Sequence, residues 1–394
     1  MMVENIKCPG CGSSDIEIFY EALNVPVHSC LMMSSREDAE NFPRGDVILG
    51  FCGDCGFIFN TAFDPSRSSY SAAYEDQQSY SSTFNSFAEK LAKDLIKKFN
   101  LKNKNIVEIG CGKGDFLALM CELGDNNGVG IDPACVKERL KSSAAERIMV
   151  IDDYYSEKYA DYTGDFVVCR HTLEHIPNTA EFLGTLRSGI GDKLETRILF
   201  EIPETIRVLR EKAFWDIYYE HCSYFTPCSL GRLFRNCRFD VLDMYLEYDD
   251  QYLLIEAGPS QVKPEKKHPL EESIDELRKE VDRFGENVGS SLDSWRNRFS
   301  GYRDEKKKIA VWGSSSKCVA FLTALHLEDD NLRIVDVNPN RHGKFIPGAA
   351  KEVHSPDSLR EYNPDVVIVM NPIYEDEIRS MLADLKLKPR LFSV

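Results

Sequence analysis

The chain has 394 residues, of which 43% are hydrophobic and 28% charged, so large-scale disorder is excluded and two or three globular domains are expected. Lysine and arginine number 48 against 64 aspartates and glutamates, and the formal net charge of −16 repels a phosphate backbone. We therefore expect no nucleic-acid partner. The sequence has no signal-peptide core and no apolar run long enough to span a bilayer, so we expect a cytoplasmic protein without a membrane partner.

The first region of the chain contains two Cys-x-x-Cys-Gly turns about forty residues apart. Four thiolates on two such turns close a tetrahedral coordination sphere, so we predict a structural zinc site. A redox role is the weaker alternative, because a redox Cys-x-x-Cys normally occurs singly and at a helix start. His28 and Cys30 lie between the turns as possible substitute ligands, although we expect them to be packing or surface residues. The predicted ligands are Cys8, Cys11, Cys52 and Cys55.

Alternating helical and strand patterns follow this region. Apolar positions at helical spacing from Phe84 to Ile96 predict a helix. From Asn105 onward, short apolar runs alternate with helical stretches, which indicates a parallel sheet flanked by helices, with a helix after each of the first two runs. The runs are NIVEIG, GVGID, RIMVID, DFVVCR and RILFEI. The segment FDVLDMYLEYDDQYLLIEA then predicts two antiparallel strands that close the domain near Ala257.

The last third of the chain begins with apolar residues spaced by three and four between Pro269 and Phe299, which predict one long amphipathic helix. A second, smaller set of α/β units follows. Its predicted strands are KIAVWG, RIVDVN and DVVIVMN.

A glycine-rich turn follows the first strand of the larger α/β region, in the sequence VEIGCGKG. Its glycines stand where the backbone must turn and approach a ligand closely. Acidic residues end the next two strands, where one can bind ribose hydroxyls and the other an adenine amino group. A nicotinamide dinucleotide is the competing ligand; we favour S-adenosylmethionine, because Glu108 suits its cationic end and would be an awkward neighbour for a pyrophosphate. The candidate cofactor residues are Glu108, Gly110, Gly112, Gly114, Asp132 and Asp152.

The order of motifs along the chain resembles that of the three-domain sugar C-methyltransferases. Besides the cysteine turns, the similar motifs are VEIGCGKGDF, RHTLEHIPNTAEFL, FEIPE, YYEHCSYFTP, WGSSSKCVAFL and VDVNPNRHGKFIPG. That family uses S-adenosylmethionine to methylate nucleotide-linked 4-keto-6-deoxy sugars at carbon 3, a step of deoxysugar biosynthesis. The resemblance implies an α/β fold with a class I, Rossmann-like methyltransferase domain.

The same resemblance implies how the chain is divided. The expected parts are a zinc-binding domain at 1–66, the methyltransferase domain at 67–260, a linker with the long helix at 261–300, and a C-terminal Rossmann-like domain at 301–394 that helps to hold the nucleotide sugar.

Further site residues are implied by the resemblance. It places His171 in the cofactor pocket and matches Tyr218, Glu220 and His221 to the family's Tyr-x-Glu-His cluster, with the histidine as base. A family tyrosine from the preceding segment corresponds to Tyr74 or Tyr80. The substrate-binding residues implied in the last domain are Ser315, Lys317 and Asp336. Serines 314–316 and Cys318 stand where the family often has glycine or alanine.

Carbon methylation beside a ketone requires the loss of a weakly acidic proton before the enolate carbon attacks the methyl group. His221 is the residue type best suited to accept that proton, Glu220 could orient its ring, and a tyrosine could bind the oxyanion. We expect His175 to pack near the cofactor. Two alternatives remain open: an O- or N-methyltransferase acting on another small metabolite, and a non-catalytic scaffold that binds zinc and cofactor.

Overall fold

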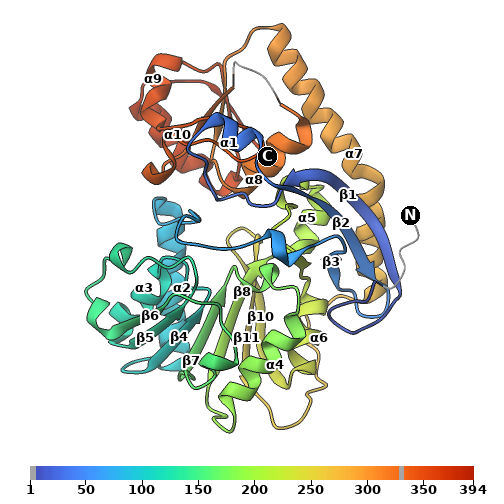
Figure 1. Ribbon diagram of the computed structural model, residues 1–394, viewed down its shortest axis with the longest axis vertical. Helices are drawn as coiled ribbons and strands as arrows, with labels where there is room; N and C mark the ends of the chain where they lie inside the picture. Colours follow the sequence, from blue (N-terminus) through green and yellow to red (C-terminus); the bar gives the residue numbers. More distant parts are fainter. Residues whose placement is uncertain (1–5, 328–331) are drawn as a thin grey trace.

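The computed structural model of the chain describes residues 6–327 and 332–394, which form three β-sheets. Residues 1–5 and 328–331, within the first and last of the expected parts, lie outside the described residues. Figure 1 shows the largest sheet in the lower half of the view, the C-terminal sheet above it and the N-terminal strands along one side. No helix of the described part is both long and apolar enough to cross a membrane.

The N-terminal sheet is antiparallel and carries the cysteine turns. Its strands β1 (Ile16–Pro26), β2 (Arg44–Cys52) and β3 (Ile58–Asn60) pair in chain order, with the short helix α1 (Arg36–Glu40) between the first two. The fourth strand, β9 (Ser223–Tyr224), comes from far along the chain and pairs with β3. The segment that follows His221 is therefore part of this sheet.

The central sheet has the class I methyltransferase fold. Five parallel strands are followed by an antiparallel hairpin, in the spatial order β10-β11-β8-β7-β4-β5-β6. The strands are β4 (Asn105–Ile109), β5 (Asn127–Ile131), β6 (Ile148–Ile151), β7 (Phe166–Arg170), β8 (Arg197–Pro203), β10 (Phe239–Glu247) and β11 (Tyr252–Pro259). The parallel sheet and the closing hairpin predicted from the apolar runs are confirmed.

Helices cover both faces of this sheet, as its apolar strands require. They are α2 (Ser82–Phe99), α3 (Asp115–Gly124), α4 (Thr179–Ile190), α5 (Thr205–Glu211) and α6 (Pro227–Asn236). The prediction of a helix between β5 and β6 is wrong, because this segment forms only the 3-10 turns Lys137–Arg139 and Ala145–Arg147. Val136, Leu140 and Ala144 do stand at helical spacing, but Ser142 and the backbone of Ser143 donate hydrogen bonds to Glu122 of α3, which holds this segment in separate turns.

The C-terminal sheet is wholly parallel, in the order β14-β13-β12-β15-β16. Its strands are β12 (Ile309–Trp312), β13 (Leu332–Val335), β14 (Val353–His354), β15 (Val366–Val369) and β16 (Arg390–Ser393), and its helices are α8 (Ser316–Leu325), α9 (Leu359–Tyr362) and α10 (Glu375–Asp384). The second α/β unit expected from the sequence is thus present.

One long helix, α7 (Ile274–Asp304), joins the central and C-terminal sheets and runs along the side of the molecule in Figure 1. A capping box between Ser273 and Glu276 fixes its start, because each side chain accepts a hydrogen bond from the other's backbone. Its buried stripe packs against β1, α5 and α8. The long helix is confirmed, although it extends past residue 300.

Candidate active site and cysteine cluster

A cavity of about 860 Å³ lies where the central sheet, the C-terminal sheet and the segment before α2 meet. Its lining combines the glycine turn after β4, the residues after β7, the segment 216–221, and the turn between β12 and α8. Parallel α/β sheets bind ligands at the carboxyl ends of their strands, and both sheets present those ends to this cavity. Residues more than two hundred positions apart therefore share one pocket.

The glycine turn after β4 is shaped for close approach of a ligand. Gly110 has φ +70°, and a Cβ there would lie 1.9 Å from Thr172 Oγ1, so only glycine fits. Gly112, at φ +54°, donates its N–H to Asp132 Oδ2 at 2.8 Å. The Ala134 N–H donates to the other oxygen of Asp132 at 2.6 Å, so this carboxylate is held at the rim of the turn, where it lines the cavity.

Glu108 supplies the strongest sign that a cationic ligand fits beside this turn. The side chain is 3% exposed and lines the cavity, and within the described residues its Oε2 has no hydrogen-bond partner. Burial raises the pKa of Glu108 to about 8, although the charge of Arg170 acts in the opposite direction. A buried carboxylate with a free oxygen matches the cationic end of S-adenosylmethionine.

Two of the six candidate cofactor residues are not brought to the cavity wall. Gly114 instead caps α3 with φ +83°, where its conformation turns the chain into the helix. Asp152 is exposed and is absent from the residues that line the cavity, whereas Tyr154 and Tyr155 are among them. Strand β6 ends at Ile151, and the Asp152 side chain that follows it is turned to solvent.

His171 directly follows β7 with φ +48°, a conformation that histidine seldom adopts and that often marks a functional position. Its Nε2 lies 2.9 Å from Glu201 Oε1 and its Nδ1 lies 3.7 Å from Glu174 Oε1. Burial opposes the cationic form, but these two carboxylates prevail and raise the pKa of His171 to about 9. The cavity thus has a fixed cation next to the expected cofactor pocket.

His221 is buried in the wall of the cavity between two other rings. Its ring centroid lies 4.1 Å from that of Tyr218 and 4.8 Å from that of His175. Burial, together with the charges of His175 and His171, holds the pKa of His221 well below its usual value. The imidazole is therefore neutral, with a lone pair available to accept a proton or a metal ion.

The role suggested for Glu220 as the group that orients His221 is wrong. Its carboxylate points the other way, where Oε1 lies 2.8 Å from His28 Nδ1 and Oε2 accepts hydrogen bonds from the backbone and side chain of Ser29. Burial opposes its ionisation, but the hydrogen bond and charge of His28 keep the pKa of Glu220 low. The carboxylate nearest to His221 is Glu174, whose Oε1 lies 4.0 Å from His221 Nε2.

Both of the tyrosines considered in the segment before α2 line the cavity, together with a third that sequence reasoning missed. Tyr74 is buried, whereas Tyr80 is exposed and its hydroxyl accepts a hydrogen bond from Asn340 at 2.8 Å. The third is Tyr70, whose hydroxyl lies 2.7 Å from His175 Nδ1. Nothing in the local sequence distinguishes Tyr70 from its neighbours, because its partner lies 105 residues away.

The three substrate residues implied for the C-terminal part all line the cavity. Ser315 is exposed at the start of α8, and Lys317 in the first turn donates to Asp216 at 2.9 Å and to Gln251 at 3.3 Å. Burial lowers the pKa of Lys317, against the effect of Asp216. Asp336, after β13, accepts from the backbone and hydroxyl of Ser314.

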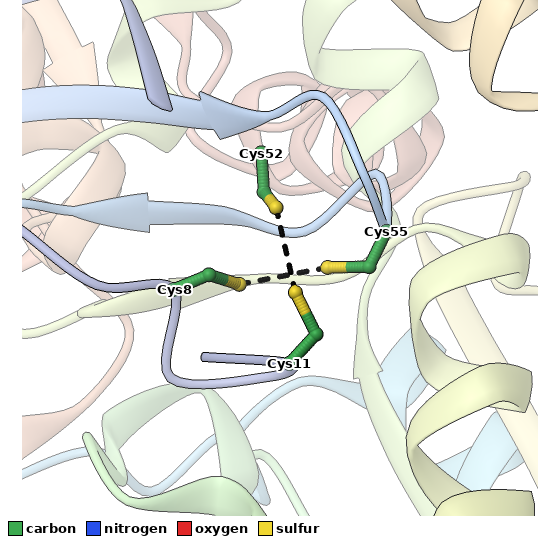
Figure 2. Close-up of side chains that lie close together, drawn as sticks. All are labelled: Cys8, Cys11, Cys52 and Cys55. Carbon is green, nitrogen blue, oxygen red and sulfur yellow. Dashed lines mark hydrogen bonds between the residues drawn. The ribbon is translucent and has the colours of Figure 1, made fainter. Parts of the chain in front are cut away.

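The cysteine turns converge on one point, as Figure 2 shows. The sulfurs of Cys8 and Cys55 are 3.5 Å apart, those of Cys11 and Cys52 are 3.6 Å apart, and all four lie within 4.8 Å of one another. Zinc–sulfur bonds of about 2.3 Å give a tetrahedron with edges of about 3.8 Å, so the four thiols fit this ion. His28 and Cys30 are elsewhere, near the cavity, where Cys30 contacts Ser316.

Two protein families match this chain, in successive stretches. A family of methyltransferase domains matches residues 84–243, which contain the glycine turn, Asp132 and His221. The family described as the C-methyltransferase C-terminal domain matches residues 262–388. The chain is an S-adenosylmethionine-dependent methyltransferase.

Individual relatives of the methyltransferase agree with this assignment. It is 26% identical to the C-methyltransferase NovU of Streptomyces niveus over 69% of this chain and 67% of that protein. A tRNA U34 carboxymethyltransferase of Nautilia profundicola is 22% identical over 32% of this chain and 46% of its own length. The first relative and the C-terminal match together support a C-methyltransferase.

Two solved structures that resemble the methyltransferase each match less than half of it. The dimethyltransferase RosA of Streptomyces davawensis shares 22% identity over 45% of this chain and 56% of its own, with a TM-score of 0.36. Magnesium protoporphyrin IX methyltransferase of Synechocystis PCC 6803 shares 14% sequence identity over 45% of this chain and 84% of its own, with a TM-score of 0.35.

Proposed function

We propose that this methyltransferase transfers a methyl group to a carbon beside the ketone of a nucleotide-linked 4-keto-deoxy sugar. The observation that carries the proposal is the single cavity shared by the glycine turn, His221 and the turn that contains Lys317. A volume of about 860 Å³ is large for one small ligand, since ligand pockets range from about 300 to 1,000 Å³. In this proposal the C-terminal sheet holds the nucleotide. We also retain the proposed division of the chain into residues 1–66, 67–260, 261–300 and 301–394.

Bound S-adenosylmethionine supplies an electrophilic methyl group on a cationic sulfur. In our proposal the cofactor lies against the backbone at Gly110 and Gly112, where no side chain blocks it. Asp132 accepts hydrogen bonds from its ribose hydroxyls, and Glu108 faces its positive charge. Asp152 and Gly114 have at most an indirect part, because neither lines the cavity. His171, fixed by Glu201, closes the pocket beside them.

His221 accepts the proton alpha to the ketone, and the C–H electrons form the enolate whose carbon then attacks the methyl group. The ring suits this role because it is buried in the cavity wall and no carboxylate lies within hydrogen-bond length of it among the described residues. The ring of Tyr218 packs against it at a tilt, and Tyr74 or Tyr70 can donate to the enolate oxygen. Glu220 acts through His28 and Ser29, as a support for this wall.

An isotope experiment tests the proposed chemistry. In deuterated water with S-adenosylhomocysteine, the parent protein should exchange the proton alpha to the ketone of its sugar substrate, and mass spectrometry of recovered sugar would detect it. His221→Gln should lose exchange while its affinity for S-adenosylmethionine stays at the parent value, because the histidine acts on the acceptor. Methyl transfer to oxygen or nitrogen without carbon-bound exchange in the parent would contradict the proposal.

We also propose that Cys8, Cys11, Cys52 and Cys55 bind one structural zinc ion. The support is the fit of their sulfur separations to a tetrahedral ion with no open position. Metal analysis of freshly purified protein should give about one zinc per chain. Cys11→Ser should lower that content and destabilise the N-terminal sheet, whereas Cys237→Ser, a cysteine far from the cluster in sequence, should not change it. Protein without zinc before any chelator is added would refute the site.

A further inference from the structure

A second cluster of metal-ligating side chains lies in the cavity wall, apart from the cysteines. Glu174, His175 and His221 each offer one ligand atom, and these atoms lie within 4.8 Å of one another. All three residues line the cavity. Glu174 and His175 come from the 3-10 turn Leu173–His175 after β7, and His221 comes from the segment before β9.

Glu174 acts on His171 through its charge across 3.7 Å, but no hydrogen bond among the described residues fixes its carboxylate. It is 2% exposed, and neither oxygen of its carboxylate has a hydrogen-bond partner among residues 6–327 and 332–394. The nearest ring nitrogens, His171 Nδ1 at 3.7 Å and His221 Nε2 at 4.0 Å, lie beyond hydrogen-bond length from Oε1. Leaving a buried carboxylate unpaired is costly, so a ligand of opposite charge at this position would stabilise it.

His175 has the outer contacts that orient a metal ligand. Its Nδ1 lies 3.0 Å from the backbone oxygen of Glu220 and 2.7 Å from the hydroxyl of Tyr70. A backbone oxygen can only accept, so Nδ1 carries the proton and Nε2 keeps the lone pair. Metal-bound histidines usually donate their other ring nitrogen to a carbonyl in this way, which fixes the tautomer.

We propose that Glu174, His175 and His221 bind one divalent transition-metal ion on the acceptor side of the cavity. Two imidazoles and one carboxylate suit Zn²⁺, Co²⁺ or Fe²⁺ better than Mg²⁺, which prefers oxygen ligands. Three protein ligands leave at least one coordination position open, and it faces the cavity, unlike the closed cysteine site. A ketone or hydroxyl oxygen of an acceptor can occupy that position.

Binding of this ion has a consequence that rests on the proposed function. The His221 lone pair that would ligate the ion is the same one that would accept the substrate proton. Cation binding and proton abstraction therefore exclude each other, and the second metal equivalent should inhibit methyl transfer. The affinity of the site for a metal ion, however, can be measured without any substrate.

The test is a Co²⁺ titration of full-length protein whose cysteine site is already filled with zinc. One equivalent should bind and give weak visible absorption without the strong sulfur-to-metal charge transfer of a four-cysteine site. Glu174→Gln and His221→Gln should each weaken binding by at least ~100-fold, since loss of even an outer contact costs about 10- to 100-fold. Tyr70→Phe, which removes only the outer hydrogen bond to His175, should cost about 10-fold.

Controls separate loss of the site from loss of the fold. Glu174→Gln removes a charge near His171 but no side-chain hydrogen bond that the structure shows, so the variant should stay folded and its zinc content should equal that of the parent. His268→Gln changes a histidine outside the cluster and should leave Co²⁺ binding unchanged.

Two results would overturn the proposal: absence of any bound Co²⁺ in folded, zinc-loaded protein, or Co²⁺ binding that survives both ligand substitutions. If the second equivalent binds and stimulates transfer, the metal site stands and His221 is not the base, so the two proposals fail separately.

Discussion

In both the central and the C-terminal sheet, a glycine with positive φ follows the first strand along the chain and an aspartate follows the second. In the central sheet these are Gly110 at +70° and Asp132, and in the C-terminal sheet Gly313 at +104° and Asp336. The two carboxylates have different surroundings. Among the described residues, Asp132 accepts hydrogen bonds from two backbone N–H groups, those of Gly112 and Ala134, which leaves lone pairs for a ligand.

Asp336 is instead enclosed by its own domain. It accepts from the N–H and hydroxyl of Ser314 and from the N–H of Asn338, and the buried guanidinium of Arg341 lies 3.5 Å away. Asn338 also donates to Glu75 at 2.9 Å. The same strand-end geometry thus leaves a carboxylate open toward the cavity in one sheet and ties the chain to the segment before α2 in the other.

The largest effect expected from this difference is on the stability of the C-terminal sheet. Arg341→Met would leave the buried carboxylate of Asp336 without its cation, and breaking a buried pair in this way costs about 3 to 5 kcal/mol of unfolding free energy. Denaturant unfolding followed by tryptophan fluorescence would measure it. Arg333→Met, which removes a cation stacked on Tyr362, should cost no more than about 1 kcal/mol. Equal losses would show that Arg341 has no special structural role.

A smaller effect is expected on cofactor affinity. Asp132→Ala should weaken S-adenosylmethionine binding by about 1.5 to 3 kcal/mol, a roughly 10- to 150-fold rise in Kd, because a charged acceptor for the ribose is lost. Asp336→Ala in the other sheet should leave this Kd unchanged. Calorimetry on both variants sharpens the comparison. Similar losses would mean that the cofactor spans both turns, and no loss in either would remove Asp132 from the site.

The smallest predicted effect is on the pH dependence of cofactor binding. Glu108, with a pKa of about 8, is largely protonated at pH 6 to 7, and a bound cation favours its ionised form. The affinity for S-adenosylmethionine should therefore rise with pH up to about 8 and then level off, with at most one proton released on binding. Calorimetry in buffers of different ionisation enthalpy would measure this pH dependence in the parent and in Glu108→Gln. The difference between the two profiles is the part that Glu108 causes. Identical pH profiles of the two proteins would show that Glu108 does not ionise on cofactor binding.

Local patterns predicted the parts of the fold and site that lie within one turn or one strand end. The glycine turn, Asp132 and the cysteine pairs belong to this group, because spacing along the chain nearly fixes their geometry. Contacts between distant segments could not be predicted in this way. The carboxylate of Glu220 faces His28, 192 residues away, rather than its neighbour His221. The prediction for Asp152 failed for another reason: the position where β6 ends does not by itself determine the direction of the next side chain.

Strand β9 has a consequence for how this protein can be divided. Ser223 and Tyr224 pair with Phe59 and Ile58 of the N-terminal sheet, and the Asn60 N–H donates to the carbonyl of Cys222. The chain immediately after His221 is therefore held by backbone hydrogen bonds from residues 58–60. A fragment that began at α2 would lack these partners, and it would keep the candidate cofactor residues while losing the support of the histidine wall. Truncation should thus uncouple cofactor binding from catalysis, so the cysteine region is not a detachable accessory module.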